Sequence, residues 1–241
     1  MDAENKLISI ISPAYNASAT IVRTIESVLG QTVSDWEMLI GDDCSSDDTV
    51  EIVSNYASES RVKLFKNEQN LGPAGTRNYL LGKAKGRYIA FLDTDDYWHS
   101  DKLEKQQSKL NQTGAAICCS GYKRQFEQKS ISVIPPEVIH YKDLLKSNHI
   151  PMLTAIIDTK KIDKPLLFEK KGHEDYQFWL DLMRSGNFCV SVSDVLAVYA
   201  AGGGESVSSN KLKAAKWHWD ILSKEPIPTY RKYINFLYYM Y

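Results

Sequence analysis

Apolar residues in the first hundred positions follow two different spacings. Short consecutive runs, often β-branched, predict strands over 7–11, 37–40, 62–65 and 88–92. Between them, apolar residues recur at every third or fourth position and predict helices over 20–29, 49–57 and 74–84. Strand–helix–strand units of this length form a mostly parallel sheet with helices on its faces. The first half of the chain is therefore predicted to be an α/β, doubly wound domain.

The second half of the chain is patterned less regularly. Its apolar spacing predicts helices over 100–110 and 175–184 and strands over 115–122, 154–157 and 190–198. We interpret the polar segment 123–136 as a surface excursion and Gly202-Gly203-Gly204 as a flexible loop. The residues after this loop are helical in pattern. The chain is expected to divide into an α/β domain over 1–205 and a helical tail over 206–241.

Polar residues gather where the predicted strands end. Segment 13–16 (Pro-Ala-Tyr-Asn) follows the first strand, Asp42-Asp43 follows the second, and segment 93–96 (Asp-Thr-Asp-Asp) follows the fourth. In an open parallel sheet, ligands bind outside the carboxyl ends of the strands. Three separate segments are therefore expected to meet in one site at this edge.

Asp93, Asp95 and Asp96 place three carboxylates in one short segment, directly after an apolar strand. Carboxylates this close repel one another unless a cation or a proton compensates their charge. Oxygen ligands suit Mg²⁺ or Mn²⁺, which bridge to substrate phosphates. The alternative is an acidic turn that caps the next helix. The position at a strand end favours the metal interpretation.

Asp42 and Asp43 also have a structural alternative, because Asp-Asp before Ser45-Ser46 is good turn chemistry. Ser45 or Ser46 is expected to cap the following helix. One carboxylate of the pair would shape the turn, and the other would accept a hydrogen bond from a base imide or a ribose hydroxyl. Tyr15 either stacks on that base or packs against the domain.

Two more segments bring charged side chains. Arg77 lies in a Gly/Pro loop, 70–78, that opens a helix, where backbone amides and a guanidinium favour an anionic or carbonyl-rich ligand; the alternative is a surface arginine. Glu174-Asp175 precedes an amphipathic helix and either caps it or takes a proton from an attacking hydroxyl. Neither a P-loop nor a G-x-G-x-x-G pattern occurs. Phosphates would therefore be held by a metal and by side chains.

Composition narrows the class of protein. Lys+Arg number 29 against Asp+Glu 30 in 241 residues, which gives no support to a general nucleic-acid binder. The cysteines, Cys44, Cys118, Cys119 and Cys189, lack C-x-x-C spacing and are expected to be reduced thiols of a cytosolic protein. Adjacent Cys118 and Cys119 should lie on opposite faces of a strand. We expect no signal peptide in the polar segment 1–6 and no membrane-spanning helix.

Together, these segments resemble glycosyltransferase family 2, whose members share the nucleotide-sugar-binding GT-A fold. The resemblance is carried by 8–16 (ISIISPAYN), 27–32 (SVLGQT), 41–49 (GDDCSSDDT), 70–78 (NLGPAGTRN), 91–96 (FLDTDD) and Glu174-Asp175. It implies a GT-A type α/β domain with a mostly parallel central sheet and flanking helices, followed here by a C-terminal helical segment.

The resemblance also implies a role for each matching position. The residues around the base, usually uracil, would be Pro13, Tyr15, Asp43 and Arg77. Asp95 would lie near the ribose and diphosphate, and Asp93, Asp95 and Asp96 form the metal-binding motif, with Asp96 as the leading ligand. Asp175, next to Glu174, matches the catalytic base. Cys44 departs from the glycine that the family often has. The Gln-x-x-Arg-Trp motif of processive synthases is absent at 177–180, which favours addition of a single sugar.

The implied activity is a metal-dependent, inverting hexosyl transfer. Asp175 would deprotonate an acceptor hydroxyl that displaces the diphosphate and leaves a β-linkage. The expected donor is UDP-glucose, with UDP-galactose and UDP-N-acetylhexosamines as alternatives. The acceptor would be a glycan or a lipid-diphosphate-linked sugar in bacterial surface polysaccharide (O-antigen, lipopolysaccharide) synthesis. The rival interpretations are a nucleotidyltransferase acting on sugar phosphates, which should show an early Gly-rich phosphate loop, and a non-catalytic sugar-binding module.

The tail interleaves basic and aromatic residues. They are Lys213, Lys216, Trp217, Trp219, Tyr230, Arg231, Lys232, Tyr233, Phe236, Tyr238 and Tyr239, with Leu237 among them. This pattern suits a helix in the membrane interface, which would hold a cytoplasmic enzyme at the inner face of the cell membrane. The alternatives are packing against the α/β domain and a homodimer contact.

Overall fold

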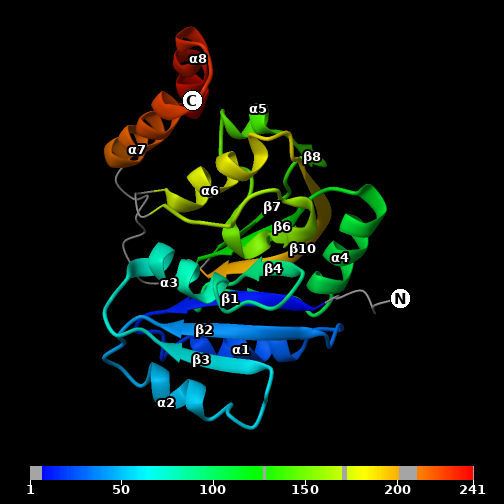
Figure 1. Cartoon of the computed structure of the whole chain (residues 1–241), viewed down its shortest axis with the longest axis vertical. Helices are drawn as coiled ribbons and strands as arrows, with labels where there is room; N and C mark the ends of the chain where they lie inside the picture. Colours follow the sequence, from blue (N-terminus) through cyan, green and yellow to red (C-terminus); the bar gives the residue numbers. More distant parts are fainter. Residues whose placement is uncertain (1–6, 127–128, 170–172, 201–210, 241) are drawn as a thin grey trace.

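The computed structural model describes residues 7–126, 129–169, 173–200 and 211–240. Its centre is one mixed sheet with the main strand order β3-β2-β1-β4-β9-β6-β10-β5 (Figure 1). These strands are β3 (Val62–Lys66), β2 (Trp36–Asp42), β1 (Ile8–Ala14), β4 (Tyr88–Phe91), β9 (Ile156–Asp158), β6 (Ile117–Gln125), β10 (Cys189–Ala200) and β5 (Tyr97–Trp98). Two further strands, β7 (Ser130–Val133) and β8 (Val138–Ile139), pair with β6 and β10.

The longest ladders of the sheet are parallel, as predicted. β1 pairs in parallel with β2 and β4, β2 with β3, and β6 with β10. The shorter antiparallel ladders involve β9, which lies between β4 and β6, and the outer strands β5, β7 and β8. The α/β fold with a largely parallel sheet is therefore confirmed.

Helices cover both faces of the sheet because its inner strands are apolar on both sides. One face packs against α1 (Ile21–Leu29), α2 (Thr49–Ser54) and α4 (Lys102–Thr113). The other packs against α3 (Gly72–Leu81), α5 (Tyr141–Leu144), α6 (Glu174–Met183) and α7 (Lys211–Lys224). Buried Cys118 and Cys119 belong to the cores on opposite faces, as predicted, and the described cysteines are free thiols.

Two strand predictions were wrong. β1 does not stop before Pro13 but continues to Ala14, with Pro13 paired in register with Gly41 of β2. Proline has no N–H to donate to a ladder. The β1–β4 ladder ends at Ile11, so no hydrogen bond to β4 is required from Pro13. Segment 123–136 is not simply a surface excursion, because its described part extends β6 to Gln125 and adds β7 as an antiparallel partner.

The C-terminal segment is helical, as predicted, and consists of α7 and α8 (Thr229–Met240) at one end of the molecule (Figure 1). Glu225, between the two helices, is buried and accepts hydrogen bonds from Arg184 at the end of α6 at 2.8 and 3.1 Å. The predicted boundary at 205, the loop Gly202-Gly203-Gly204, the segment 1–6 and the side chain of Lys213 lie outside the described residues. Among the helices that the structure describes, none combines the length and apolarity needed to cross a bilayer.

Candidate functional site

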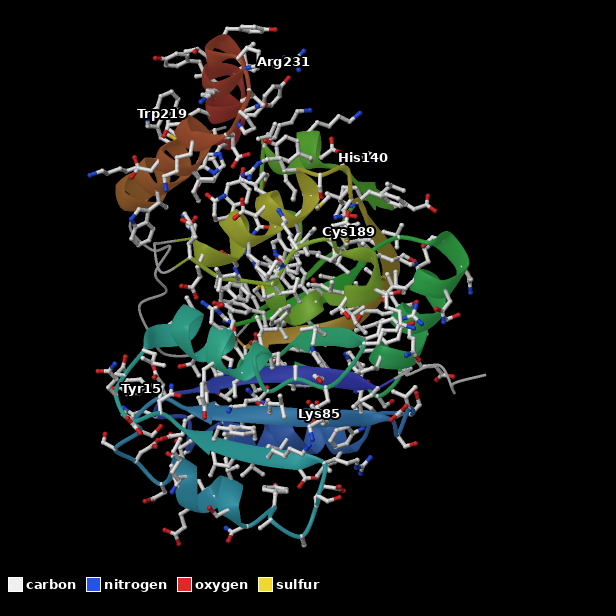
Figure 2. All side chains as sticks on the ribbon, viewed as in Figure 1. Tyr15, Lys85, His140, Cys189, Trp219 and Arg231 are labelled. Atoms are coloured by element: carbon white, nitrogen blue, oxygen red, sulfur yellow. The ribbon has the colours of Figure 1, made fainter. Side chains whose placement is uncertain are left out.

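Three segments meet where β1, β2 and β4 end, because parallel neighbours finish at the same edge of a sheet. Tyr15 marks this edge in Figure 2, opposite the edge where Lys85 precedes β4, and its side chain is 57% exposed. The loops after β1 and β2 are joined. The amide of Asn16 donates to Ser45 Oγ at 2.9 Å, and the amide of Ser46 donates to Asn16 Oδ1 at 2.8 Å. They therefore form a single rim with an exposed aromatic ring.

The predicted cap by Ser45 or Ser46 was wrong, because these serines hold Asn16 instead. The N-cap residue of α2 is Asp48, without a side-chain cap bond. The neighbouring Asp47 carboxylate accepts from the Thr49 amide at 3.1 Å and from the Ser18 amide at 3.0 Å. The acids of this segment thus fix the turn that carries the rim.

The two carboxylates at the end of β2 are both buried but differ in their bonding. Asp43 accepts from Asn67 Nδ2 at 2.8 Å and from the amides of Leu71 and Gly72 at 2.7 and 2.8 Å. Gly72 has a φ of 70°, a conformation that favours glycine, and opens α3. Within the described part of the chain, the Asp42 carboxylate accepts only from the Ser45 amide, at 3.4 Å. Asp43 therefore secures the loop before α3, while Asp42 retains more accepting capacity; nucleotide binding by Asp43 stays a prediction.

The acidic loop after β4 holds its three carboxylates in different environments. Asp93 is partly exposed, Asp95 is exposed, and Asp96 is 1% exposed with Oδ1 accepting from the Ala200 amide at 3.1 Å. Burial, followed by the charges of Asp95 and Asp93, raises the pKa of Asp96 to about 9. Although the Asp95 side chain reaches solvent, desolvation by the surrounding loop, followed by the charge of Asp93, also raises the pKa of Asp95. The loop therefore concentrates negative charge that a cation would relieve.

These carboxylates fit a hard divalent cation. No three His, Cys, Asp or Glu side chains in the described part of the chain form a ready-made cage. Mg²⁺ and related ions need none, because they bind through one or two carboxylates together with water and substrate phosphates. Asp96 fits that requirement: its carboxylate accepts one hydrogen bond from the described residues, from the Ala200 amide, and it has two acidic neighbours.

Arg77 is not the surface arginine of the alternative interpretation, since it is 5% exposed and joins two acidic segments. Its Nη2 donates to Asp93 Oδ1 at 2.6 Å and its Nη1 donates to Glu174 Oε1 at 2.8 Å. Its Nε finds no hydrogen-bond partner among the described residues. The predicted site residues of α3, the acidic loop and α6 are thereby brought together, while Tyr15 and Pro13 belong to the rim beside them.

Glu174 and Asp175 open α6 and have different partners. Glu174 is paired with Arg77, and burial raises its pKa. Asp175 Oδ2 accepts from Asn148 Nδ2 at 3.0 Å, and no partner of its Oδ1 is found among the described residues. His173, just before them, has a φ of 47° and its ring contacts Trp217 of α7 edge-on at 5.3 Å. Asp175 is thus the carboxylate with an oriented and available oxygen.

The sequence interpretation missed two residues that shape this site. Asn148 orients Asp175 from 27 positions away, and no local pattern marks it. Thr24 of α1 places its hydroxyl 2.9 Å from the Thr94 carbonyl and 2.7 Å from the Asp96 carbonyl, which fixes the acidic loop. Thr24 is a buried polar residue on the apolar face of a helix, and that feature is a usable signal.

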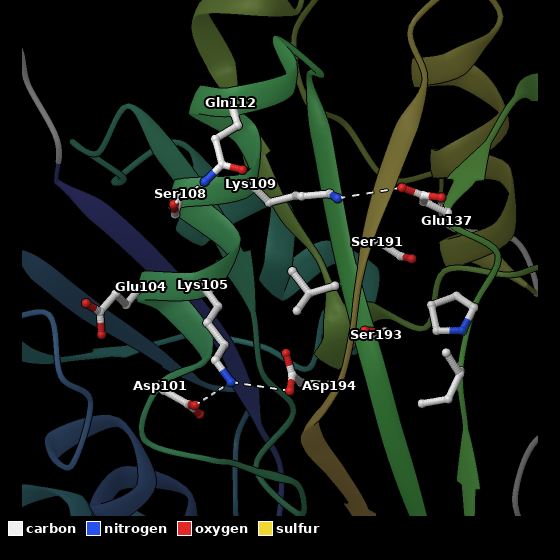
Figure 3. A pocket seen from close by; sticks show the side chains of 13 residues that line it. Asp101, Glu104, Lys105, Ser108, Lys109, Gln112, Glu137, Ser191, Ser193 and Asp194 are labelled. Carbon is white, nitrogen blue, oxygen red and sulfur yellow. Dashed lines mark hydrogen bonds and ion pairs between the residues drawn. The ribbon is translucent and has the colours of Figure 1, made fainter.

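Two hollows lie outside this carboxylate cluster. The larger, about 960 Å³, lies between α4 and β10 and contains none of the predicted site residues (Figure 3). Its lysines are paired with acids: Lys105 contacts Asp101 at 2.8 Å and Asp194 at 3.4 Å. The smaller, about 470 Å³, lies between α6 and α7 and is lined by Gln177 and Trp217 among others. Only the second adjoins the helix that carries Glu174 and Asp175.

The chain matches known proteins over most of its length. The profile of glycosyl transferase family 2 matches residues 9–161. The chain is 38% identical over 221 residues to WfgD of Escherichia coli, a UDP-Glc:α-D-GlcNAc-diphosphoundecaprenol β-1,3-glucosyltransferase, covering 91% of this chain and 86% of WfgD.

Two solved structures share the fold at low sequence identity. S. aureus TarS 1-349 in complex with UDP-GlcNAc gives a TM-score of 0.75 at 21% identity, over 98% of this chain and 71% of that one. The mannosyltransferase PcManGT from Pyrobaculum calidifontis, in complex with GDP-Man and Mn²⁺, gives 0.73 at 16% identity, over 97% and 69%. The GT-A type fold is therefore confirmed.

Proposed function

The chain belongs to glycosyltransferase family 2, and we propose that it moves one glucose from UDP-glucose to a sugar held on a lipid diphosphate, forming a β-linkage. The observation that carries this proposal is the junction at Arg77, which sets the acidic loop beside Glu174 and Asp175. A diphosphate-binding loop and a free carboxylate are the two parts that such a transfer needs. The activity named for WfgD supports the choice of donor and acceptor.

Asp175 acts as the general base in this proposal. Asn148 holds Oδ2 at 3.0 Å, so Oδ1 is oriented to take the proton of the acceptor hydroxyl. The deprotonated oxygen of the acceptor then attacks the anomeric carbon on the face opposite the leaving diphosphate. This single displacement inverts the configuration of the α-linked donor. Glu174, paired with Arg77, positions the start of α6. Asp175 and Glu174 therefore have different roles, the first as the base and the second as a positioning residue.

The donor is proposed to lie along the rim with its diphosphate toward the acidic loop. Tyr15 offers an exposed ring to the base beside Pro13, and Asp42 offers a carboxylate to the imide or ribose. Mn²⁺ or Mg²⁺, held by Asp96 with Asp93 and Asp95 beside it, would offset negative charge on the leaving diphosphate. PcManGT, which shares this fold, was solved in complex with Mn²⁺, and this supports the choice of metal.

The acceptor is proposed to reach Asp175 from the side of α7, where the 470 Å³ hollow adjoins α6. Gln177 lines this hollow beside Trp217, Asp220 and Ser223, polar and aromatic side chains that suit contact with a sugar. A lipid-linked acceptor would place the enzyme at the inner face of the cell membrane, in surface polysaccharide synthesis.

The decisive experiment offers purified protein UDP-glucose, UDP-galactose and UDP-GlcNAc with a synthetic α-D-GlcNAc-diphospho-lipid. We expect transfer from UDP-glucose, release of UDP and a β-anomeric coupling in the product. An α product would rule out single displacement. Release of pyrophosphate from a sugar phosphate and UTP would identify a nucleotidyltransferase, and glycan binding without turnover would identify a sugar-binding module.

A further inference from the structure

Helix α8 carries two apolar stripes, of which only one is covered by the rest of the described chain. Its inner stripe packs on α7: Phe236 contacts Trp219 edge-on at 5.2 Å, and Tyr239 stacks on His218 at 3.7 Å. Asn235, between them, is buried. The inner stripe therefore packs within the tail, and the tail meets the α/β domain where His218 stacks on Tyr176 and where Phe236 packs against the core.

The outer stripe repeats at the three- and four-residue spacing of one helix face. It consists of Tyr230, Tyr233, Ile234, Leu237 and Tyr238, whose side chains are 60%, 56%, 47%, 58% and 62% exposed. Tyr233 touches Trp219 at 5.0 Å and the stripe otherwise faces outward. A contiguous band of large exposed apolar groups marks an interaction surface rather than scattered surface residues.

The position of α8 leaves this band accessible. Figure 1 shows α8 projecting at the end of the molecule beyond α5 and α6, away from the sheet. Glu225 and Arg184 fasten the α7–α8 connection to the α/β body. The connection that leads into α8 is therefore joined to α6, the helix that carries Asp175.

The charge on α8 indicates what covers the band. Arg231 is the exposed cation of α8 and no acid occurs from 229 to 240, while Lys232 donates to the Ser223 carbonyl on the α7 side. Lys146 adds a second cation beside the band, with Nζ 5.4 Å from the centre of the Tyr238 ring. Tyrosines rimmed by cations suit the headgroup region of an anionic bilayer, whereas a second copy would bring like charges together.

We infer that the outer stripe of α8 lies in the headgroup region of an anionic membrane and holds the active site beside it. The inference rests on the proposed function in one respect: a lipid-linked acceptor is what makes such contact useful. Because α8 and α6 are joined through Glu225, docking of the stripe would fix the distance between Asp175 and the bilayer.

Point substitution tests the stripe better than removal of the tail from Ser223, which would also remove Glu225. We compare Leu237→Glu with Ile131→Glu, a matched control on β7 whose side chain is 55% exposed. The full-length proteins are co-sedimented with phosphatidylglycerol/phosphatidylcholine vesicles and with phosphatidylcholine vesicles, at low and high salt. Circular dichroism and thermal unfolding confirm that the variants are folded.

We expect the wild-type protein and Ile131→Glu to bind phosphatidylglycerol vesicles at low salt, and Leu237→Glu to bind about tenfold less. Arg231→Gln should weaken binding and reduce its dependence on salt. No binding by the wild type, or equal binding by the two glutamate variants, would overturn the inference. A dimer that Leu237→Glu dissociates, without vesicle binding, would assign the stripe to a second copy.

An activity measurement separates this inference from the proposed function. Leu237→Glu should transfer glucose normally to a water-soluble, short-chain GlcNAc-diphospho acceptor and lose transfer only to acceptor embedded in vesicles. If no variant transfers glucose to either acceptor, the proposed function fails while the vesicle-binding result stands by itself. If Leu237→Glu uses the embedded acceptor as well as wild type does, the stripe does not serve the active site.

Discussion

Arg77 Nη1 lies 2.8 Å from Glu174 Oε1, although 97 residues separate the two along the chain. The same buried guanidinium contacts Asp93 at 2.6 Å. One side chain of α3 therefore sets the distance between the acidic loop after β4 and the start of α6. In the proposed reaction this is the distance between the donor's diphosphate and the base.

Arg77→Lys tests that relationship. Lysine keeps the charge but replaces the planar fork with one ammonium, so it does not serve both acids in the same geometry. We expect kcat/KM to fall about a hundredfold, a loss of about 2.7 kcal/mol of transition-state stabilisation. The control is Arg87→Lys, which disturbs the Arg87–Asp158 pair at the opposite end of β4. Arg87→Lys should lower the melting temperature without the hundredfold loss in kcat/KM. If both variants lose kcat/KM equally, the role of Arg77 is structural.

Asp175→Asn should nearly abolish transfer, because the amide does not accept the proton of the acceptor hydroxyl. The expected loss in kcat is about a hundred- to ten-thousandfold, with UDP binding by calorimetry almost unchanged. Glu174→Gln should be the milder change, since it only weakens the contact with Arg77. If Glu174→Gln is the more damaging of the two, the base is assigned to the wrong neighbour.

Asn148→Ala should act through Asp175. Loss of the 3.0 Å hydrogen bond frees the Asp175 carboxylate to rotate, so we expect kcat to fall about tenfold while the KM for the donor stays unchanged. A combined Asn148→Ala and Asp175→Asn variant should be no worse than Asp175→Asn alone. Additive losses would mean that Asn148 contributes independently of the base.

Asp96→Ala should remove most activity, and Asp93→Ala should do likewise with an added loss because Arg77 Nη2 loses its partner while Nη1 stays paired with Glu174. Loss of a metal contact near the diphosphate is expected to cost on the order of a hundredfold or more in rate. Excess EDTA should reproduce the loss in the wild type, and Mn²⁺ or Mg²⁺ should restore it. Undiminished turnover in EDTA would disprove the metal assignment.

His218 should make the tail sensitive to acid. Burial, and then His173, lowers its pKa from 6.5 to about 4, so below pH 6.5 the unfolded chain binds more protons than the folded one. This contribution to stability is complete above pH 6.5 and is lost as the pH falls toward 4. We expect His218→Phe, which keeps the ring between Tyr176 and Tyr239, to reduce the fall in melting temperature between pH 7 and pH 5 by about 5 °C. Exposed His99→Gln is the control and should change nothing.

The regular part of the fold followed from local pattern. The segments 37–40 and 62–65 lie within β2 and β3, because short runs rich in apolar residues suit strands whether they are fully buried, as β2 is, or partly exposed at the edge of the sheet, as β3 is. The acidic residues at strand ends were also predictable, since parallel strands bring their carboxyl ends to one edge. Segment 123–136 was not, because β7 is an exposed strand that exists through its pairing with β6.

The sequence by itself determined the α/β class, the family and the edge at which the acids gather, because these depend on periodicity and on motifs whose residues are neighbours in the chain. Only the tertiary structure decided which carboxylates are engaged. Asp43 accepts hydrogen bonds from the loop before α3, and Glu174 is paired with Arg77. Asp175 is oriented by a hydrogen bond from Asn148. The physical reason is that hydrogen bonding and burial are set by atoms tens of residues away, and no local spacing contains them.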